Sequence, residues 1–325
     1  MHQQLIKMSR LCAAGLLAVG AASAAHAQSY PSRPIHVVIA YNPGGTTDPV
    51  GRIFADVLRD GFKAVVVTEN KGGAGGSIGT AYVKTQPADG YTLLVHTNSV
   101  TLQAATVAAP IYDPVKDLAP ITMLTSLPME IVVPKNSPFA NLGDMVKAAK
   151  ERPGKLNLAH GGFGTYGWYT MMRYMLDEGF KLTDVPYTSA AAVQMAVLKG
   201  EADMAIDSPA GVGKFVQDGS MRALALSGEE RSRFTPDIPT GKEQGQAFRG
   251  IAWVGMMAPA GTDPKIVNAI YEQLKAGAAK PDVKERVAKL GMDLDLREPA
   301  AFGRSIADEF ATTKRIITTQ KIPLQ

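Results

Sequence analysis

The sequence predicts an α/β fold made of two lobes, each with its own parallel or mixed sheet, joined by two hinge crossings. Residues 35–99 alternate between apolar strands, small polar turns and helices, and residues 156–209 repeat that order with different letters. Such alternation is typical of parallel sheets covered by helices. Two extended apolar segments, 120–134 and 251–257, are the expected crossings between the lobes.

The first residues have the composition of a secretory signal peptide. Lys7 and Arg10 precede a short apolar stretch, Leu11 to Val19, and small residues at Ala25 and Ala27 follow. A positive start, an apolar centre and a small-x-small cleavage site define such signals. The apolar stretch is shorter than the roughly 20 residues of a bilayer-spanning helix. We therefore expect residues 1–27 to be removed after Ala27 and the rest to enter the periplasm, with an uncleaved membrane anchor as the alternative.

Composition argues against several classes of function. The single cysteine, Cys12, lies inside the signal, so the mature chain has no disulfide and no thiolate nucleophile or metal ligand. The chain has 34 basic residues; without the two of the signal, 32 oppose 30 acidic ones, a formal charge of +2. The basic residues are dispersed, and no later apolar stretch is long enough to span a bilayer. We expect a monomer without a nucleic-acid partner.

The first lobe is predicted to occupy residues 28–126 and 252–325. Its parallel strands are expected at 35–40, 64–67 and 91–95. The first helix starts at Asp48 and Pro49, because proline suits the first helical position and aspartate can cap it. The next helix starts near Ser77. Three C-terminal helices, expected at 264–279, 282–290 and 299–314, complete this lobe.

The second lobe is predicted to occupy residues 127–251. A helix at 141–150 precedes its strands and ends at Pro153 and Gly154. The strands are expected at 156–159, 183–186, 202–206 and 221–226. Residues 229–250 are rich in proline, glycine and charge, which predicts a long surface loop.

The turns that follow the strands predict a ligand cleft between the lobes. Ligands of open α/β sheets bind beyond the carboxyl ends of the strands. Glycine lets the backbone approach a ligand closely, and the first N–H groups of a helix favour an anion. From the first lobe we expect Tyr41, Gly44, Thr46, Thr47, Ser77, Asn98 and Ser99 to bind the ligand.

The second lobe offers a corresponding set of residues. From it we expect His160, Phe163, Thr165, Tyr187, Ser189 and Asp207 to bind the ligand. His160 and Thr165 could donate to a carboxylate. Phe163, with Tyr166 and Trp168, could form an aromatic wall, or these rings could pack between helices. Asp207 could orient a ligand donor or bind an amine, or it could serve as a hinge or cap partner.

The sequence gives little support for catalysis or cofactor binding. Gly72 to Ser77 has four glycines but lacks the Gly-Lys-Ser/Thr ending of a P-loop. The three histidines that follow the signal, His36, His96 and His160, are not spaced as metal ligands. We therefore expect no enzyme, cofactor or metal. An exported hydrolase whose triad assembles in space is the alternative from a different class.

A set of segments along the chain matches one known family in order. They are Tyr30 to Ile35, Pro43 to Asp48 with Arg52, Glu69 to Gly79, Pro87 to Leu94, Val185 to Tyr187, Gly200 to Met204, Arg222 to Ala225 and Ala258 to Thr262. Together they resemble the periplasmic solute receptors of tripartite tricarboxylate transporters, the Bug family. The resemblance implies a type II-like periplasmic binding protein. Such a protein closes on a small carboxylate and delivers it to integral-membrane transporter subunits. Backbone and hydroxyl groups of the first turn, here Gly44 to Thr47, would hold the ligand.

One turn departs from the family pattern. Residues 160–165 commonly carry small Ser, Gly or Asn, whereas this chain has His160 and Phe163, and Tyr41 also differs. A larger, flatter ligand would fit this change, and our hypothesis is an aromatic dicarboxylate of the phthalate or terephthalate type. Aliphatic di- or tricarboxylates such as citrate are the alternative, as is a sensory receptor that passes its ligand to a signalling partner.

Overall fold

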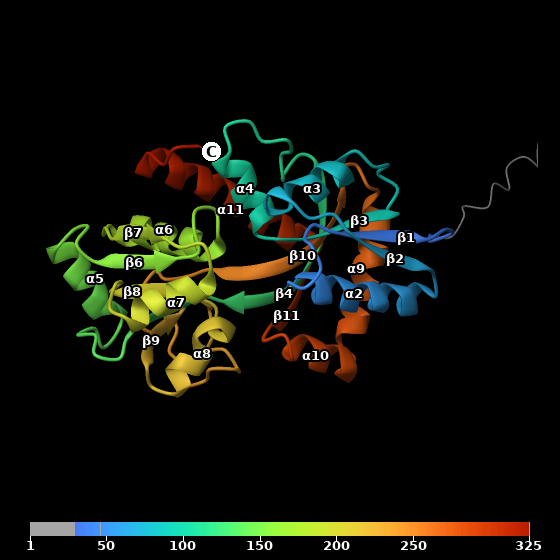
Figure 1. The fold of residues 1–325 in the computed structure, drawn as a ribbon. Helices are drawn as coiled ribbons and strands as arrows, with labels where there is room; N and C mark the ends of the chain where they lie inside the picture. Colours follow the sequence, from blue (N-terminus) through green and yellow to red (C-terminus); the bar gives the residue numbers. More distant parts are fainter. Residues whose placement is uncertain (1–29, 46, 325) are drawn as a thin grey trace, which may run out of the picture. The chain divides into compact units, whose positions relative to one another are not determined.

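A computed structural model of the chain describes residues 30–45 and 47–324 (Figure 1). The predicted signal peptide, residues 1–27, and Thr46 lie outside the described residues. Arg33 and the residues after it form one unit built on two mixed sheets flanked by helices. Within the described residues, every helix is too short or too polar to cross a membrane.

The first sheet has six strands in the order β11-β4-β10-β3-β1-β2. Its parallel part consists of β1 (Ile35–Ile39), β2 (Val66–Asn70) and β3 (Thr92–Thr97). The antiparallel part consists of β4 (Leu118–Pro128), β10 (Ile251–Pro259) and β11 (Asp293–Arg297). The central strand β1 is almost continuously apolar because both of its faces are buried, whereas the edge strand β2 alternates. We call this sheet and its helices the first lobe.

Seven helical segments belong to the first lobe. They are α2 (Thr47–Phe62), the short η1 (Ala74–Gly76), α3 (Ser77–Lys84), α4 (Ser99–Thr106), α9 (Pro264–Ala278), α10 (Pro281–Ala288) and α11 (Pro299–Gln320). Helix α2 buries the stripe formed by Val50, Phe54 and Leu58. It packs closely on α9 because Gly277 has no side chain: a Cβ there would lie 2.2 Å from a methyl of Val57.

The second sheet has five strands in the order β7-β6-β8-β5-β9. Parallel strands are β6 (Asn157–His160), β7 (Thr183–Pro186) and β8 (Met204–Asp207); β5 (Glu130–Pro134) is antiparallel to β8 and to β9 (Met221–Leu226). Its helices are α5 (Leu142–Glu151), α6 (Tyr166–Glu178), α7 (Ala190–Leu198) and α8 (Pro209–Gln217). We call this sheet and its helices the second lobe.

The chain passes between the two sheets twice, but not where two unbroken strands were expected. The predicted segment 120–134 is divided at Met129: β4 ends at Pro128 in the first sheet, and β5 begins at Glu130 in the second. The predicted crossing 251–257 lies entirely in β10 of the first sheet. The return crossing is therefore made by residues 227–250. The exact lobe boundaries at 126/127 and 251/252 stay predictions.

The last helix reaches the second lobe as well as the first. Ile316 of α11 is fully buried in an apolar cluster that otherwise consists mainly of second-lobe residues. Two ion pairs join α11 to α6: Arg173 Nη1 lies 3.7 Å from Asp308 Oδ2, and Arg315 Nη2 lies 3.9 Å from Asp177 Oδ1. Helix α11 is thus a third link between the lobes, beside the two chain crossings.

Candidate functional site

A cavity of about 330 Å³ lies at the carboxyl ends of β1 and β3, which we call the front cavity. It is lined by Tyr41, Gly45, Thr47, Thr97, Asn98, Ser99, Leu127, Tyr166, Ala252, Trp253, Val254 and Met292. Most of these residues belong to the first lobe, and Tyr166 comes from the first turn of α6 in the second. The cavity is therefore located where a ligand of an open α/β sheet is expected.

Thr47, at the end of the first turn, lines the front cavity. It is the first residue of α2, and it is almost completely buried. Gly44 has a φ of +99° and open space around it, and Thr46 lies outside the described residues. Asn70, the last residue of β2, stabilises the turn: its Nδ2 donates to the Tyr41 carbonyl at 2.9 Å and to Asp48 Oδ1 at 2.8 Å.

Both residues that follow β3, Asn98 and Ser99, line the front cavity. Ser99 opens α4 and lines the cavity. Asn98 is buried, and both ends of its amide are engaged: Nδ2 donates to the Glu309 carboxylate at 3.0 Å, and Oδ1 accepts the Trp253 backbone N–H at 2.6 Å. Asn98 thus lines the front cavity while its amide is held by other residues of the protein, and its role in binding the ligand stays a prediction. No sequence signal pointed to Glu309.

Tyr41 and Ser77 also lie in different places. The Tyr41 hydroxyl is 2.7 Å from Thr97 Oγ1, beside the front cavity, and burial raises its pKa. Ser77 opens α3 but lines a separate cavity of about 350 Å³, together with Gln103 and Tyr112. The structure therefore does not bring Ser77 to the front cavity.

The structure places both ring nitrogens of His160 against groups of the protein, and its role in binding stays a prediction. Its side chain is fully buried, and Nε2 lies 2.6 Å from Asp184 Oδ1, an ion-pair distance. Its Nδ1 accepts the backbone N–H of Gly162 at 3.0 Å. Both ring nitrogens thus face groups of the protein, so the ring offers no donor to a carboxylate. In this structure the histidine therefore stabilises the turn that follows β6.

The predicted aromatic wall is only partly formed. Trp168 is fully buried, and Phe163 is 45% exposed. The two rings are arranged edge to face, with their centroids 6.0 Å apart. Neither ring lines the front cavity, whereas Tyr166 does. The aromatic surface of the cavity is therefore made by Tyr41, Tyr166 and Trp253, and the last of these was expected only in a crossing strand.

The remaining second-lobe candidates act locally in this structure. Thr165 and Ser189 cap helices α6 and α7 by accepting N–H groups of Trp168 and Ala192. Tyr187 packs against the apolar cluster beneath α7. Asp207 accepts the Ser208 N–H at 2.7 Å and the Gln194 amide at 3.3 Å. None of the four predicted residues lines the front cavity, and their roles in binding stay predictions.

A buried carboxyl at the first crossing escaped the sequence analysis. Glu130 opens β5 and is paired in register with Asp207 of β8. Its side chain is fully buried, and within the described residues neither carboxyl oxygen has a hydrogen-bond partner. Burial, assisted by the charge of Asp207, raises the pKa of Glu130 to about 7. An acidic residue inside the apolar run 129–133 is the sequence feature that could have indicated this buried carboxyl.

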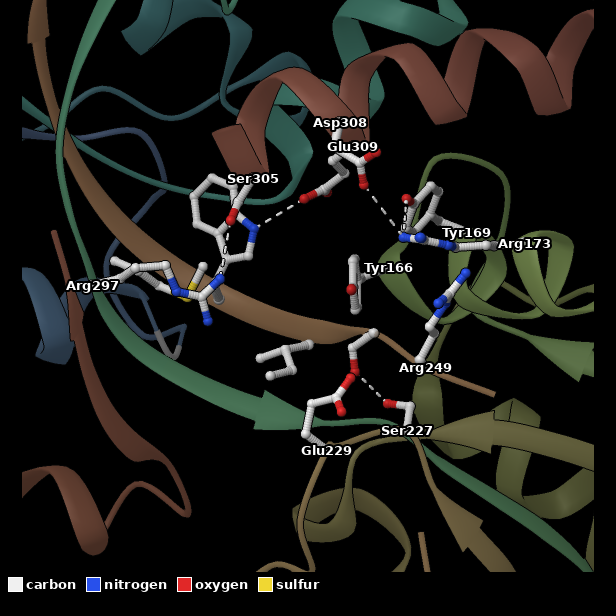
Figure 2. A pocket seen from close by; sticks show the side chains of 14 residues that line it. Tyr166, Tyr169, Arg173, Ser227, Glu229, Arg249, Arg297, Ser305, Asp308 and Glu309 are labelled. Carbon is white, nitrogen blue, oxygen red and sulfur yellow. Dashed lines mark hydrogen bonds and ion pairs between the residues drawn. The ribbon is translucent and has the colours of Figure 1, made fainter. Parts of the chain in front are cut away.

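A second cavity lies on the other side of Tyr166 and Trp253, and we call it the back cavity (Figure 2). Its volume is about 280 Å³, and it lies among α6, α11, β10 and the segments around residues 227–229 and 249–250. Three arginines line it, but each has a carboxylate partner: Asp308 near Arg173, Asp177 near Arg249 and Asp295 near Arg297. These pairings favour the front cavity as the candidate site.

The front cavity combines two helix starts with a lining whose described residues are uncharged, which favours the binding of an anion. Helices α2 and α4 both begin at it, and their first N–H groups have no partner within the helix, which favours an anion. Its described lining contains no charged side chain and no histidine. Across the described residues, no group of three or more His, Cys, Asp or Glu is placed to hold a metal.

The comparisons with known proteins agree with this geometry. A family model of tripartite tricarboxylate transporter receptors, TctC, matches residues 50–322. The UPF0065 protein in the gbd 5′ region of Cupriavidus necator is 33% identical over 303 residues, covering 90% of this chain and 89% of that protein. Protein BugT of Bordetella pertussis is 31% identical over 293 residues, covering 89% and 90%.

Solved structures resemble the chain over nearly their whole length. A TctC solute-binding protein from Polaromonas gives a TM-score of 0.81 at 26% identity, covering 90% of this chain and all of that one. MatC from Rhodopseudomonas palustris, solved with malate, gives 0.67 at 26% over 89% of this chain and all of that one. An R. palustris protein solved with adipate gives 0.70 at 25% over 90% and 99%. These matches confirm the predicted fold class and family, and the chain belongs to the tripartite tricarboxylate transporter receptors, a family of periplasmic solute-binding proteins rather than enzymes.

Proposed function

We propose that this chain is a periplasmic receptor that binds a small carboxylate in the front cavity and delivers it to integral-membrane transporter subunits. The observation that carries the proposal is the start of two helices, at Thr47 and Ser99, at one cavity whose described lining has no charged side chain. Each helix start contributes about 0.3–1 kcal/mol toward an anion, and up to about 2 where partly buried. Charged hydrogen bonds add about 1.5–3 kcal/mol each.

Those contributions are large enough for the proposed function. A micromolar site needs about 8 kcal/mol, which two helix starts and a few charged hydrogen bonds can supply without a buried arginine. Malate and adipate in two structural relatives support a dicarboxylate as the ligand of this chain.

Within the dicarboxylates we propose an aromatic ligand of the phthalate or terephthalate type. The support is now Tyr166 and Trp253, which line the front cavity, whereas His160 and Trp168 are not among its lining residues. An aromatic pair contributes about 0.5–1.5 kcal/mol beyond its buried area. Aliphatic dicarboxylates are the second candidate, favoured by the ligands of the two relatives.

A thermal-shift screen of residues 28–325 tests both proposals. The panel is malate, adipate, citrate, phthalate and terephthalate, with chromatography to show whether each is recovered intact. A bound ligand raises the unfolding midpoint by mass action. A shift with any member, without turnover, supports the receptor. Cleavage of a methyl ester of terephthalate, incubated beside the panel, would favour the hydrolase, and no shift with any member would contradict carboxylate binding.

A variant at Tyr166 separates the two ligand classes. Tyr166→Leu keeps an apolar side chain at the cavity but removes the aromatic ring. An aromatic ligand should lose affinity in this variant while an aliphatic one is little affected. Tyr82→Leu, on the exposed face of α3 away from the front cavity, is the matched control. Midpoint shifts confined to malate or adipate would overturn the aromatic proposal and leave the receptor function standing.

A further inference from the structure

Glu309 is an acidic side chain that is buried inside the protein and accepts hydrogen bonds from three other residues. It lies on α11 and is 7% exposed. Asn98 Nδ2 donates to both of its oxygens, at 3.0 and 3.1 Å, and Thr101 Oγ1 donates to Oε1 at 3.0 Å. The Trp253 indole N–H donates to Oε2 at 3.0 Å (Figure 2). One side chain of α11 thus joins the start of α4 to β10.

Both segments border the front cavity. Asn98 is the N-cap of α4 and is followed by Ser99, Thr101 lies in the first turn of that helix, and Trp253 lies on β10. The Asn98 amide closes a ring, because its oxygen accepts the Trp253 backbone N–H at 2.6 Å. Glu309 itself lines the back cavity and not the front one. It therefore contacts the residues of the binding turn from behind.

We propose that Glu309 is a positioning residue that holds the Thr97 to Ser99 turn and the Trp253 ring in the arrangement that binds the ligand. The expected effect of Glu309 on ligand affinity rests on the proposed function. Its expected effect on the geometry of the turn does not. The physical reason is that a buried carboxylate orients every donor that faces it, since each donor left unpaired would cost free energy. Without the carboxylate, the Asn98 amide can rotate, and the first N–H groups of α4 lose their fixed direction.

The central variant is Glu309→Gln, which keeps the size of the side chain and replaces one acceptor oxygen with a donor. That amide nitrogen would face donors already pointing at it. We expect the indole N–H signal of Trp253 and the backbone amide signal of Ser99 to move in nitrogen–proton NMR spectra. Trp253→Phe identifies the indole signal, because Trp168 is the other tryptophan. Glu298→Gln, exposed at the start of the same helix, is the matched control.

Affinity is the second readout. For whichever dicarboxylate of the panel shifts the wild-type midpoint, we expect Kd to rise about tenfold in Glu309→Gln, equivalent to about 1.4 kcal/mol. Thr101→Val removes one donor without touching the front cavity and should weaken binding less, in the same direction. It also serves if Glu309→Gln does not fold.

The outcomes separate this inference from the proposed function. A merely structural Glu309 would lower the unfolding midpoint but leave Kd and the Ser99 amide signal at their wild-type values, and that result would overturn the inference. If no dicarboxylate binds the wild-type protein, the proposed function fails. The Ser99 and Trp253 signals still decide whether Glu309 holds the turn.

Discussion

Replacing Glu130 with glutamine should change how the stability of the protein depends on pH. Burial raises the pKa of Glu130 from 4.5 to about 7 in the folded state. A carboxyl whose pKa is raised in the folded state makes its most favourable contribution to the free energy of unfolding at pH values below its pKa in the unfolded chain. This contribution is lost as the pH rises from about 4.5 to about 7. The difference of about 2.5 between the two pKa values corresponds to about 3 kcal/mol. The wild-type protein should carry that cost in full above pH 8.

Urea denaturation at pH 5 and pH 8 measures this difference. Relative to wild type, Glu130→Gln should reduce the loss of unfolding free energy between the two pH values by about 2–3 kcal/mol. Comparing the two pH values removes any constant cost of the new amide. Glu272→Gln on the exposed face of α9 should leave the pH dependence unchanged. An identical pH dependence in Glu130→Gln and wild type would refute the reasoning, because it would show that Glu130 titrates as it does in the unfolded chain.

Two further substitutions separate structural residues from binding residues. Gly76→Ala should destabilise the protein by more than about 1 kcal/mol in urea denaturation, because Gly76 has a φ of +93° and its Cβ would lie 2.1 Å from His96 Nε2. Gly154→Ala, at a φ of +69° with open space around it, should cost less; an equal cost would refute the clash. His160→Ala should lower the unfolding midpoint, since it leaves Asp184 without its buried partner, while ligand affinity in calorimetry changes little. A large loss of affinity at unchanged stability would place His160 in the ligand set.

Local sequence patterns predicted most of the fold because those patterns have local causes. The apolar run of β1 reflects burial on both faces, and the predicted start of the first helix at Asp48 lies one residue from its observed start at Thr47. Strand β11, with its alternating Asp-Leu-Asp-Leu, was missed because it pairs with β4, far away in the sequence. The second crossing was misplaced because extended apolar strands look alike whether they cross lobes or end inside one sheet.

The site was harder to predict because its polar residues have distant partners. Thr47 and Ser99 were predicted from the turns that follow the first and third strands, and both residues line the front cavity. Asn98 looked equally suitable, but its amide is held by Glu309, 211 residues away. Likewise His160 is held by Asp184 from the neighbouring strand. A polar residue after a strand can therefore be assigned to ligand or scaffold only when its long-range partner is known.

The most direct test of the account is a calorimetric titration of residues 28–325 with the dicarboxylates malate, adipate and terephthalate, repeated on Thr47→Val. The account predicts one site per chain for at least one of them and a clear loss of affinity in Thr47→Val, which removes a hydroxyl from a residue that lines the front cavity. Thr318→Val, exposed on α11, should bind as wild type does. Binding of none of the three, or binding that Thr47→Val leaves unchanged, would contradict a carboxylate site in the front cavity.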